Sequence, residues 1–183
     1  MSEDRSSWQV KGSSILSELV SLMDLSSDEA ALLKALSAQA KSTAPQMTES
    51  FYERLFKHEN TAEYLQGKPM ERLHSMVGEW FTELFSGTYD EQYVQKRLII
   101  GEIHVRIGLP VRYPLSMLDV IMQFGESVAQ TSTDPEKTNA AFRKILALDV
   151  AIFNQAYEDN QLNHLSNLVG GERLARRLLS GSV

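Results

Sequence analysis

The chain of 183 residues has 24 acidic and 18 basic side chains, a formal net charge of −6 and a hydrophobic fraction of 43%. This composition is typical of a soluble globular domain with a full apolar core. The acidic balance argues against nucleic acid as the main partner, because phosphate binding requires a basic surface. The absence of cysteine excludes disulfides and every metal site that needs a thiolate ligand.

The sequence has no stretch of about 20 apolar residues, which is the length that a helix needs to cross a bilayer. The first seven residues are polar and partly acidic, unlike a secretory signal. We therefore expect a cytoplasmic protein without a membrane span.

The amino-terminal region is expected to contain a tail and one short helix. Residues 1–12 have no regular apolar pattern and should be disordered, with an exposed Trp8. From Ser13 the apolar residues recur at helical spacing, which predicts a short helix or a free amphipathic segment. Residues 1–25 are assigned to this tail and helix.

Two helices are predicted before a turn at residues 58–61. Ser26 followed three residues later by Glu29 is the pattern of a capping box, which marks the start of the first helix. This helix should end near Ser42. Pro45 is expected to open the second helix, since proline is tolerated in the first helical turn.

The middle of the chain predicts two further helices. One starts after Pro69 and has apolar residues at every third or fourth position, namely Met70, Leu73, Val77, Trp80, Phe81 and Leu84. Asp90 can cap the other, which should end at Gly108, because a glycine close to a following proline stops a helix.

The last third of the chain predicts two long helices and a tail. Pro114 should open the first, and Asp134 should cap the second, which is expected to reach about Leu165. Residues 166–183 contain a Gly-Gly pair and a short arginine-rich segment, and we assign them to a linker or tail. The sequence therefore predicts an all-α protein with one main domain and no strands.

A histidine lies in the apolar segment between Ile99 and Pro110. Helical geometry places His104 on one face with two glycines and two isoleucines, namely Ile100, Gly101, Ile107 and Gly108. Because glycine has no side chain, a broad flat group could lie close to the backbone there. The carbonyl of Ile100, one turn earlier, is the nearest partner for an imidazole N–H. The alternative is a core histidine at a helix end.

The pattern Ile-Gly-x-x-His-x-x-Ile-Gly-Leu-Pro at residues 100–110 resembles the proximal-histidine segment of the globin-coupled sensors, a gas-sensing branch of the globins. Further matching fragments lie upstream, namely Phe51-Tyr52, Glu71-Arg72-Leu73, Glu79-Trp80 and the segment from Leu84 to Asp90. The resemblance covers roughly residues 26–160. It implies a sensor globin domain, assigned to residues 26–165, with an extra amino-terminal helix.

The resemblance also implies a non-covalent haem b, with His104 as the axial ligand of its iron. It places Leu73 and Val77 on the distal side and matches Tyr52 to a tyrosine that hydrogen-bonds oxygen. A phenol O–H in a dry pocket stabilises the partial negative charge of that ligand. The other expected wall residues are Phe51, Trp80, Ile107 and Tyr113, for which ordinary core packing is the alternative.

One further histidine is close to this predicted site. His74 follows Leu73 and should point about 100° away from it, to the pocket edge or into solvent. Axial ligation of the iron by His74, opposite His104, is an open alternative.

The implied function is a sensor of O₂, and of CO or NO, that regulates a carboxyl-terminal output such as a diguanylate cyclase, histidine kinase or chemotaxis transducer. We expect no enzymatic activity in this domain. The alternatives are a haem-free dimeric scaffold and a haem globin with dioxygenase-type activity, for which Leu73 and Val77 offer no acid–base group.

Assembly is predicted from the apolar stripes of the two long carboxyl-terminal helices. Helices 114–130 and 135–165 of two chains should form a four-helix interface in a homodimer. The stripes include Leu118, Met122, Gly125, Val128, Leu148, Ile152 and Tyr157.

Overall fold

The computed structural model describes residues 6–10 and 13–181, and in these residues helices are joined by turns without any strand. The helices are α1 (Ser13–Met23), α2 (Ser27–Ala35), α3 (Ser37–Phe56), α4 (Glu59–Ala62), α5 (Met70–Glu83), α6 (Glu91–Arg106), α7 (Arg112–Ser116), α8 (Leu118–Ala129), α9 (Pro135–Val169) and α10 (Glu172–Leu179). Two short 3₁₀ segments are η1 (Ser6–Gln9) and η2 (Glu63–Leu65). The all-α prediction is confirmed.

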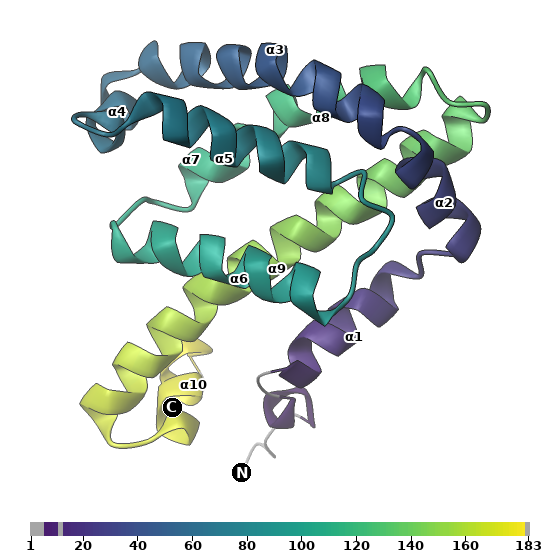
Figure 1. Cartoon of the computed structure of the whole chain (residues 1–183). Coiled ribbons are helices and arrows are strands. Elements are labelled where there is room, and N and C mark those ends of the chain that lie inside the picture. Colours follow the sequence, from purple (N-terminus) through teal and green to yellow (C-terminus); the bar gives the residue numbers. More distant parts are fainter. Residues whose placement is uncertain (1–5, 11–12, 182–183) are drawn as a thin grey trace.

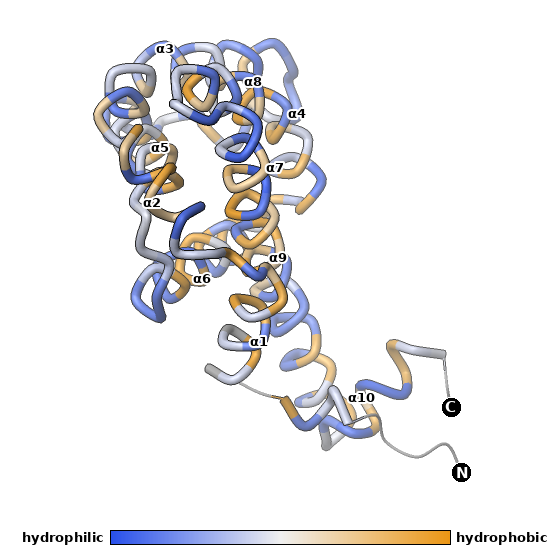
Figure 2. Tube along the Cα trace, turned by 90° about the vertical axis from the view of Figure 1, so that its right-hand side faces the viewer, coloured by the Kyte–Doolittle hydropathy of each residue, from blue (hydrophilic) through white to orange (hydrophobic). Residues whose placement is uncertain are grey.

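Two pairs of helices build the body of the molecule. α3 and α5 lie side by side in one layer, and α6 packs along α9 in the other (Figure 1). α8 packs against both α3 and α9, and the short α7 connects it to α6. Seen from the side, α1 and α10 lie below this body, near the two ends of the chain (Figure 2).

An apolar core lies where α3, α5, α8 and α9 meet. Phe81, Phe85 and Phe142 are fully buried, and the rings of Phe85 and Phe142 stack with their centroids 5.4 Å apart. A Cβ atom on Gly125 would lie 1.9 Å from the Phe142 ring. The glycine therefore allows α8 and α9 of the same chain to approach closely.

The predicted interface stripes are mostly used in this core. Val128, Leu148 and Ile152 are buried within the chain, while Met122 on α8 is exposed. The assignment of these three buried residues to a contact with a second chain is therefore wrong. Helical periodicity identifies an apolar face, but it does not identify the helix that covers the face.

Three predicted capping motifs are confirmed. The side chain of Ser26 accepts a hydrogen bond from the N–H of Glu29, whose carboxylate accepts one from the N–H of Ser26 at 2.8 Å. Asp90 and Asp134 each accept a hydrogen bond from the backbone N–H three residues later, at 3.0 and 3.1 Å. These bonds pair N–H groups that helix starts leave without a partner.

Two predicted helix starts are wrong. Pro45 lies inside α3, because the chain breaks at Leu36 instead. The carbonyl of Lys41, which would bond to residue 45, lies on an exposed turn and can be solvated, so the proline is tolerated. Pro114 lies inside α7, and the predicted long helix is divided at the buried Met117, whose N–H bonds to the carbonyl of Pro114.

The amino-terminal prediction is confirmed in part. The short helix is present as α1, which packs against α9. Trp8 in η1 is half-buried rather than exposed, with the Arg176 guanidinium 6.0 Å from its ring centroid. The rest of the segment expected to be disordered, residues 1–5 and 11–12, lies outside the described residues.

The carboxyl-terminal segment folds back on α9. Gly170 adopts a left-handed conformation (φ +80°) that ends α9, which reaches Val169 rather than Leu165. α10 then packs against α9 and buries Ala175 completely. In the described part of the chain, we find no helix long and apolar enough to cross a membrane.

Candidate functional site

His104 lies in the last turn of α6, and its two ring nitrogens differ. Nδ1 lies 2.7 Å from the carbonyl oxygen of Ile100, the partner expected from the sequence, so this nitrogen donates its N–H. Nε2 has no hydrogen-bond partner among the described residues. Burial lowers the pKa of His104, and the hydrogen bond to Ile100 opposes that shift only in part. The imidazole is therefore neutral at pH 7, with a lone pair on Nε2.

Apolar side chains beside His104 are exposed. Ile103 on α6 and Ile107, which directly follows α6, are 39% and 46% exposed. α5 lies above α6 in Figure 1. Isolated exposed apolar residues are common on proteins, but two of them next to an unpaired imidazole in the same turn fit a binding surface. These residues fit a large apolar group with a metal at its centre, such as haem.

Tyr52 on α3 supplies a hydroxyl group from a largely buried side chain. Its side chain is 5% exposed, and burial raises its pKa to about 12, so the phenol stays protonated at physiological pH. Within the described part of the chain, the hydroxyl has no hydrogen-bond partner. An O–H without a protein partner is a donor available to a ligand.

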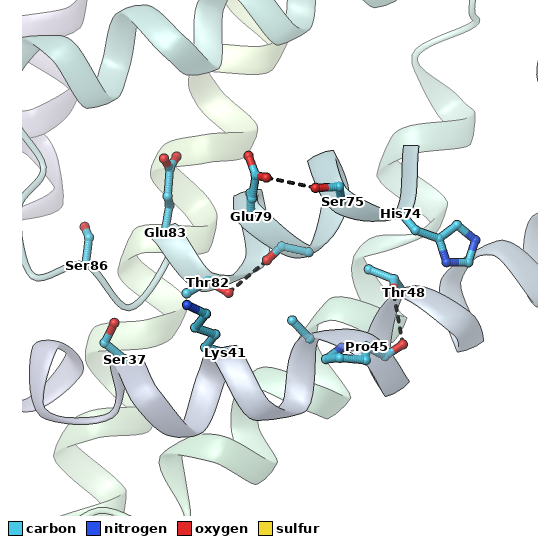
Figure 3. Close-up of a pocket in the computed structure, with 12 residues that line it drawn as sticks. Ser37, Lys41, Pro45, Thr48, His74, Ser75, Glu79, Thr82, Glu83 and Ser86 are labelled. Atoms are coloured by element: carbon cyan, nitrogen blue, oxygen red, sulfur yellow. Dashed lines mark hydrogen bonds between the residues drawn. The ribbon is translucent and has the colours of Figure 1, made fainter. Parts of the chain in front are cut away.

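His74 stacks on Tyr52. The imidazole and the phenol ring lie 4.5 Å apart between centroids and are inclined by only 11°. His74 is half-buried and lies at one end of a groove of about 630 Å³ between α3 and α5 (Figure 3). The expectation that its side chain lies at an edge or in solvent is therefore only partly met, because α3 covers one face of the ring.

The other predicted wall residues lie in different surroundings. Leu73 and Val77 are half-buried on α5, and Val77 packs against the core, as does Phe51 on α3. Tyr113 lies beyond the end of α6, where the Arg112 guanidinium is 4.6 Å from its ring centroid. The Tyr113 ring also lies 6.3 Å from that of Tyr64, whose hydroxyl donates to the carbonyl of Gly108.

Trp80 belongs to a buried charged cluster that the sequence analysis missed. Its indole N–H donates to the Asp149 carboxylate at 2.7 Å, and the Tyr93 hydroxyl donates to the same carboxylate at 2.6 Å. Arg97 forms an ion pair with Asp149 at 2.9 Å and with Glu83 at 2.5 Å. The cluster joins α5, α6 and α9.

Arg97 and Asp149 are only 3% and 5% exposed. Burial raises the pKa of Asp149, but Arg97 and the donated hydrogen bonds lower it, and we assign an ionised carboxylate at neutral pH. One guanidinium nitrogen of Arg97, Nη2, is buried without a partner among the described residues. The sequence signal for this pair is a charged residue on an otherwise apolar helix face, since Arg97 precedes Gly101 by four residues.

Gly101 has a different role from the one that the sequence suggested. A Cβ atom there would lie 2.7 Å from the Cβ of Ala156 and 3.2 Å from the carbonyl oxygen of Phe153. The glycine therefore brings α6 close to α9 and does not make room for a flat ligand. Gly108 does end the helix, in a left-handed conformation with φ +71°.

No cluster of three or more histidine, cysteine or acidic side chains in the described ranges could bind a metal ion by itself. A metal at His104 would therefore need ligands from outside these side chains. This donor set suits an iron whose other ligands come from a porphyrin ring.

Comparison with known proteins identifies a family. A family model described as Protoglobin matches residues 13–163. A solved structure, the globin domain of a globin-coupled sensor from Geobacter sulfurreducens, is similar with a TM-score of 0.71 and 30% sequence identity, covering 77% of this chain and 96% of that one. No curated protein matches the chain.

Proposed function

The chain belongs to the protoglobin family, and from this premise we propose that it binds haem b non-covalently through Nε2 of His104 and senses O₂, with CO and NO as further ligands. The observation on which this proposal rests is the neutral imidazole of His104, with an unpaired Nε2 beside the exposed Ile103 and Ile107. Haem bound there would supply an iron atom that can bind a diatomic gas.

The protein side chains would determine how firmly haem and gas are bound. The hydrogen bond from Nδ1 to the Ile100 carbonyl orients the imidazole and increases its basicity as a ligand. Leu73, Val77, Phe51, Trp80, Ile107 and Tyr113 are proposed as walls. Tyr52 is proposed to donate its hydrogen bond to O₂, since its side chain is largely buried and its hydroxyl has no partner within the described residues. CO is less polar and gains less from this bond.

The proposed domain is a sensing module, and its response would be transmitted through α9. α6 contains His104 and packs along α9. α9 ends at Val169, so its last turn already belongs to residues 166–183, the proposed linker to an output domain. A diguanylate cyclase, a histidine kinase or a chemotaxis transducer is the proposed class of output. A gas can change the equilibrium between two conformations of the protein only to the extent that it binds them with different affinities.

The absorbance spectrum tests the proposal. The purified protein, reconstituted with haem, should show a Soret band, and His104→Gly should weaken haem binding strongly. Added imidazole should restore the band in His104→Gly, because it fills the space of the lost side chain. His164→Gly is the matched control, since His164 lies exposed on α9. A normal Soret band in His104→Gly without imidazole would exclude His104 as the ligand.

A homodimer through helices 114–130 and 135–165 remains a prediction. Its contacts would have to use the outer faces of α8 and α9, where Met122 is exposed. Sedimentation at micromolar concentration should give a dimer that Met122→Glu weakens. A monomer in both the gas-free and the O₂-bound protein would contradict this prediction.

A further inference from the structure

The ring of Tyr52 is oriented by aromatic contacts and not by a hydrogen bond. Its hydroxyl has no partner in the residues that the structure describes, so no polar contact determines the angle of the ring. Two aromatic side chains touch it. Phe51 lies edge-on, with centroids 5.3 Å apart and an interplanar angle of 76°, and His74 lies flat against it at 4.5 Å and 11°.

These two contacts differ in what they can restrain. Phe51 is the neighbour of Tyr52 in α3, so it moves with the same backbone. His74 belongs to α5 and approaches the phenol from another helix. The phenol oxygen lies on the Cβ–Cγ axis, so rotation about the Cα–Cβ bond, and not about Cβ–Cγ, would move it. The imidazole stacked at 4.5 Å opposes a swing of the phenol towards α5, because the two rings would then overlap.

His74 is itself free to act as a flat packing surface. Neither of its ring nitrogens has a hydrogen-bond partner among the described residues. His74 also lines the end of the groove between α3 and α5, near Thr48 (Figure 3). In the same groove, an ideal Cβ atom on Gly78 would lie 3.5 Å from Thr48 Cγ2, which is an ordinary van der Waals distance between α5 and α3. The distance between α3 and α5 therefore determines how closely the rings of Tyr52 and His74 stack.

We propose that His74 is a positioning residue that holds the Tyr52 hydroxyl in the direction required to bind O₂, and so determines the preference for O₂ over CO. The inference rests on the proposed function, in which Tyr52 is the donor to O₂. His74 does not touch the ligand in this arrangement; it acts through Tyr52.

Two substitutions separate stacking from every other property of His74. His74→Phe keeps a flat ring of similar size, and His74→Leu keeps the volume but removes the flat ring. We expect His74→Leu to raise the O₂ dissociation rate several-fold, up to the roughly tenfold expected for Tyr52→Phe, and to change CO dissociation by less than about twofold. His74→Phe should stay within about twofold of the unmodified protein for both gases. In the Tyr52→Phe background, His74→Leu should have no further effect.

Aromatic NMR provides a readout other than a gas dissociation rate. In the protein with ¹³C-labelled tyrosine rings, the Tyr52 resonance, assigned from its loss in Tyr52→Phe, should be shifted upfield by the facing imidazole. His74→Leu should remove this shift, and His74→Phe should retain an upfield shift. The CO complex is diamagnetic and suits this measurement.

The possible outcomes distinguish this inference from the proposed function. If Tyr52→Phe changes O₂ dissociation but His74→Leu does not, the positioning role is wrong and the proposed function stands. If His74→Phe behaves like His74→Leu, the imidazole acts as a ligand or a polar group and not as a stacking surface. If Tyr52→Phe itself leaves O₂ dissociation unchanged, both the donor role of Tyr52 and the positioning role of His74 are excluded.

Discussion

The two helix pairs of this protein pack by different physical means. α6 and α9 are joined by the buried cluster of Arg97, Asp149 and Tyr93, together with the close approach at Gly101. α3 and α5 meet at small residues and at the Tyr52–His74 stack, beside a groove lined largely by hydroxyl and charged side chains. A buried ion pair loses much free energy when one partner is displaced, whereas van der Waals contacts between small residues tolerate small shifts.

Because of this difference, the two helix pairs contribute differently to the proposed haem site. The helix that contains His104 cannot slide along α9 without breaking the bonds of Asp149. α5 contributes Trp80 and Glu83 to the same cluster, so its carboxyl-terminal end is tied to α6 and α9. Its amino-terminal half, with His74, packs against α3. The positioning of Tyr52 therefore depends on the part of α5 that charges do not restrain.

The largest effect is expected when the charged cluster is broken. Asp149→Ala leaves the Arg97 guanidinium buried without its main counter-charge, which should lower the free energy of unfolding by about 3–5 kcal/mol in a denaturant titration. The matched control is Glu126→Ala, which breaks the ion pair with the 62% exposed Arg143 and should cost about 0–1 kcal/mol. Equal losses in the two variants would contradict a structural role for the cluster.

Alanine substitution of one glycine in each helix pair should change the free energy of unfolding in opposite directions. Gly101→Ala would place a Cβ atom 2.7 Å from that of Ala156, which is buried, so we expect a loss of about 1–3 kcal/mol, partly offset by helix propensity. Gly78→Ala meets only ordinary contacts at 3.5 and 3.7 Å. The free energy of unfolding of Gly78→Ala should therefore stay equal to that of the unmodified protein or rise by up to about 1 kcal/mol. Thermal unfolding of both variants measures the difference, and a stabilised Gly101→Ala would refute the close approach of α6 to α9.

Substitution of two buried tyrosines should show that the free energy of unfolding and the O₂ dissociation rate depend on different residues. Tyr93→Phe removes the donor to Asp149 and should cost about 1–2 kcal/mol of unfolding free energy, while O₂ dissociation changes by less than about twofold. Tyr52→Phe removes a hydroxyl with no protein partner, so stability should change by less than about 0.5 kcal/mol while O₂ dissociation accelerates about tenfold. Stopped-flow kinetics and denaturation of the same samples decide this. If both variants changed both quantities alike, the two sides of the site would not be independent.

Features that depend on neighbouring residues were predictable from the sequence. The capping box of Ser26 and Glu29, the cap at Asp90 and the hydrogen bond from His104 to Ile100 each involve residues three or four positions apart. Within one helical turn, the geometry of the backbone determines which groups can meet. The all-α class follows in the same way from repeated helical periodicity, and the family could be recognised from the segment around His104.

Contacts between distant segments were not predictable in this way. Gly101 was read as space for a ligand, but it faces Ala156, and the stripe with Leu148 and Ile152 was assigned to a second chain although it lies in the core. Arg97 and Asp149 are 52 positions apart, and each looks in isolation like an ordinary solvated charge. Periodicity shows which face of a helix is buried, whereas the partner of that face depends on how all the helices pack around one core.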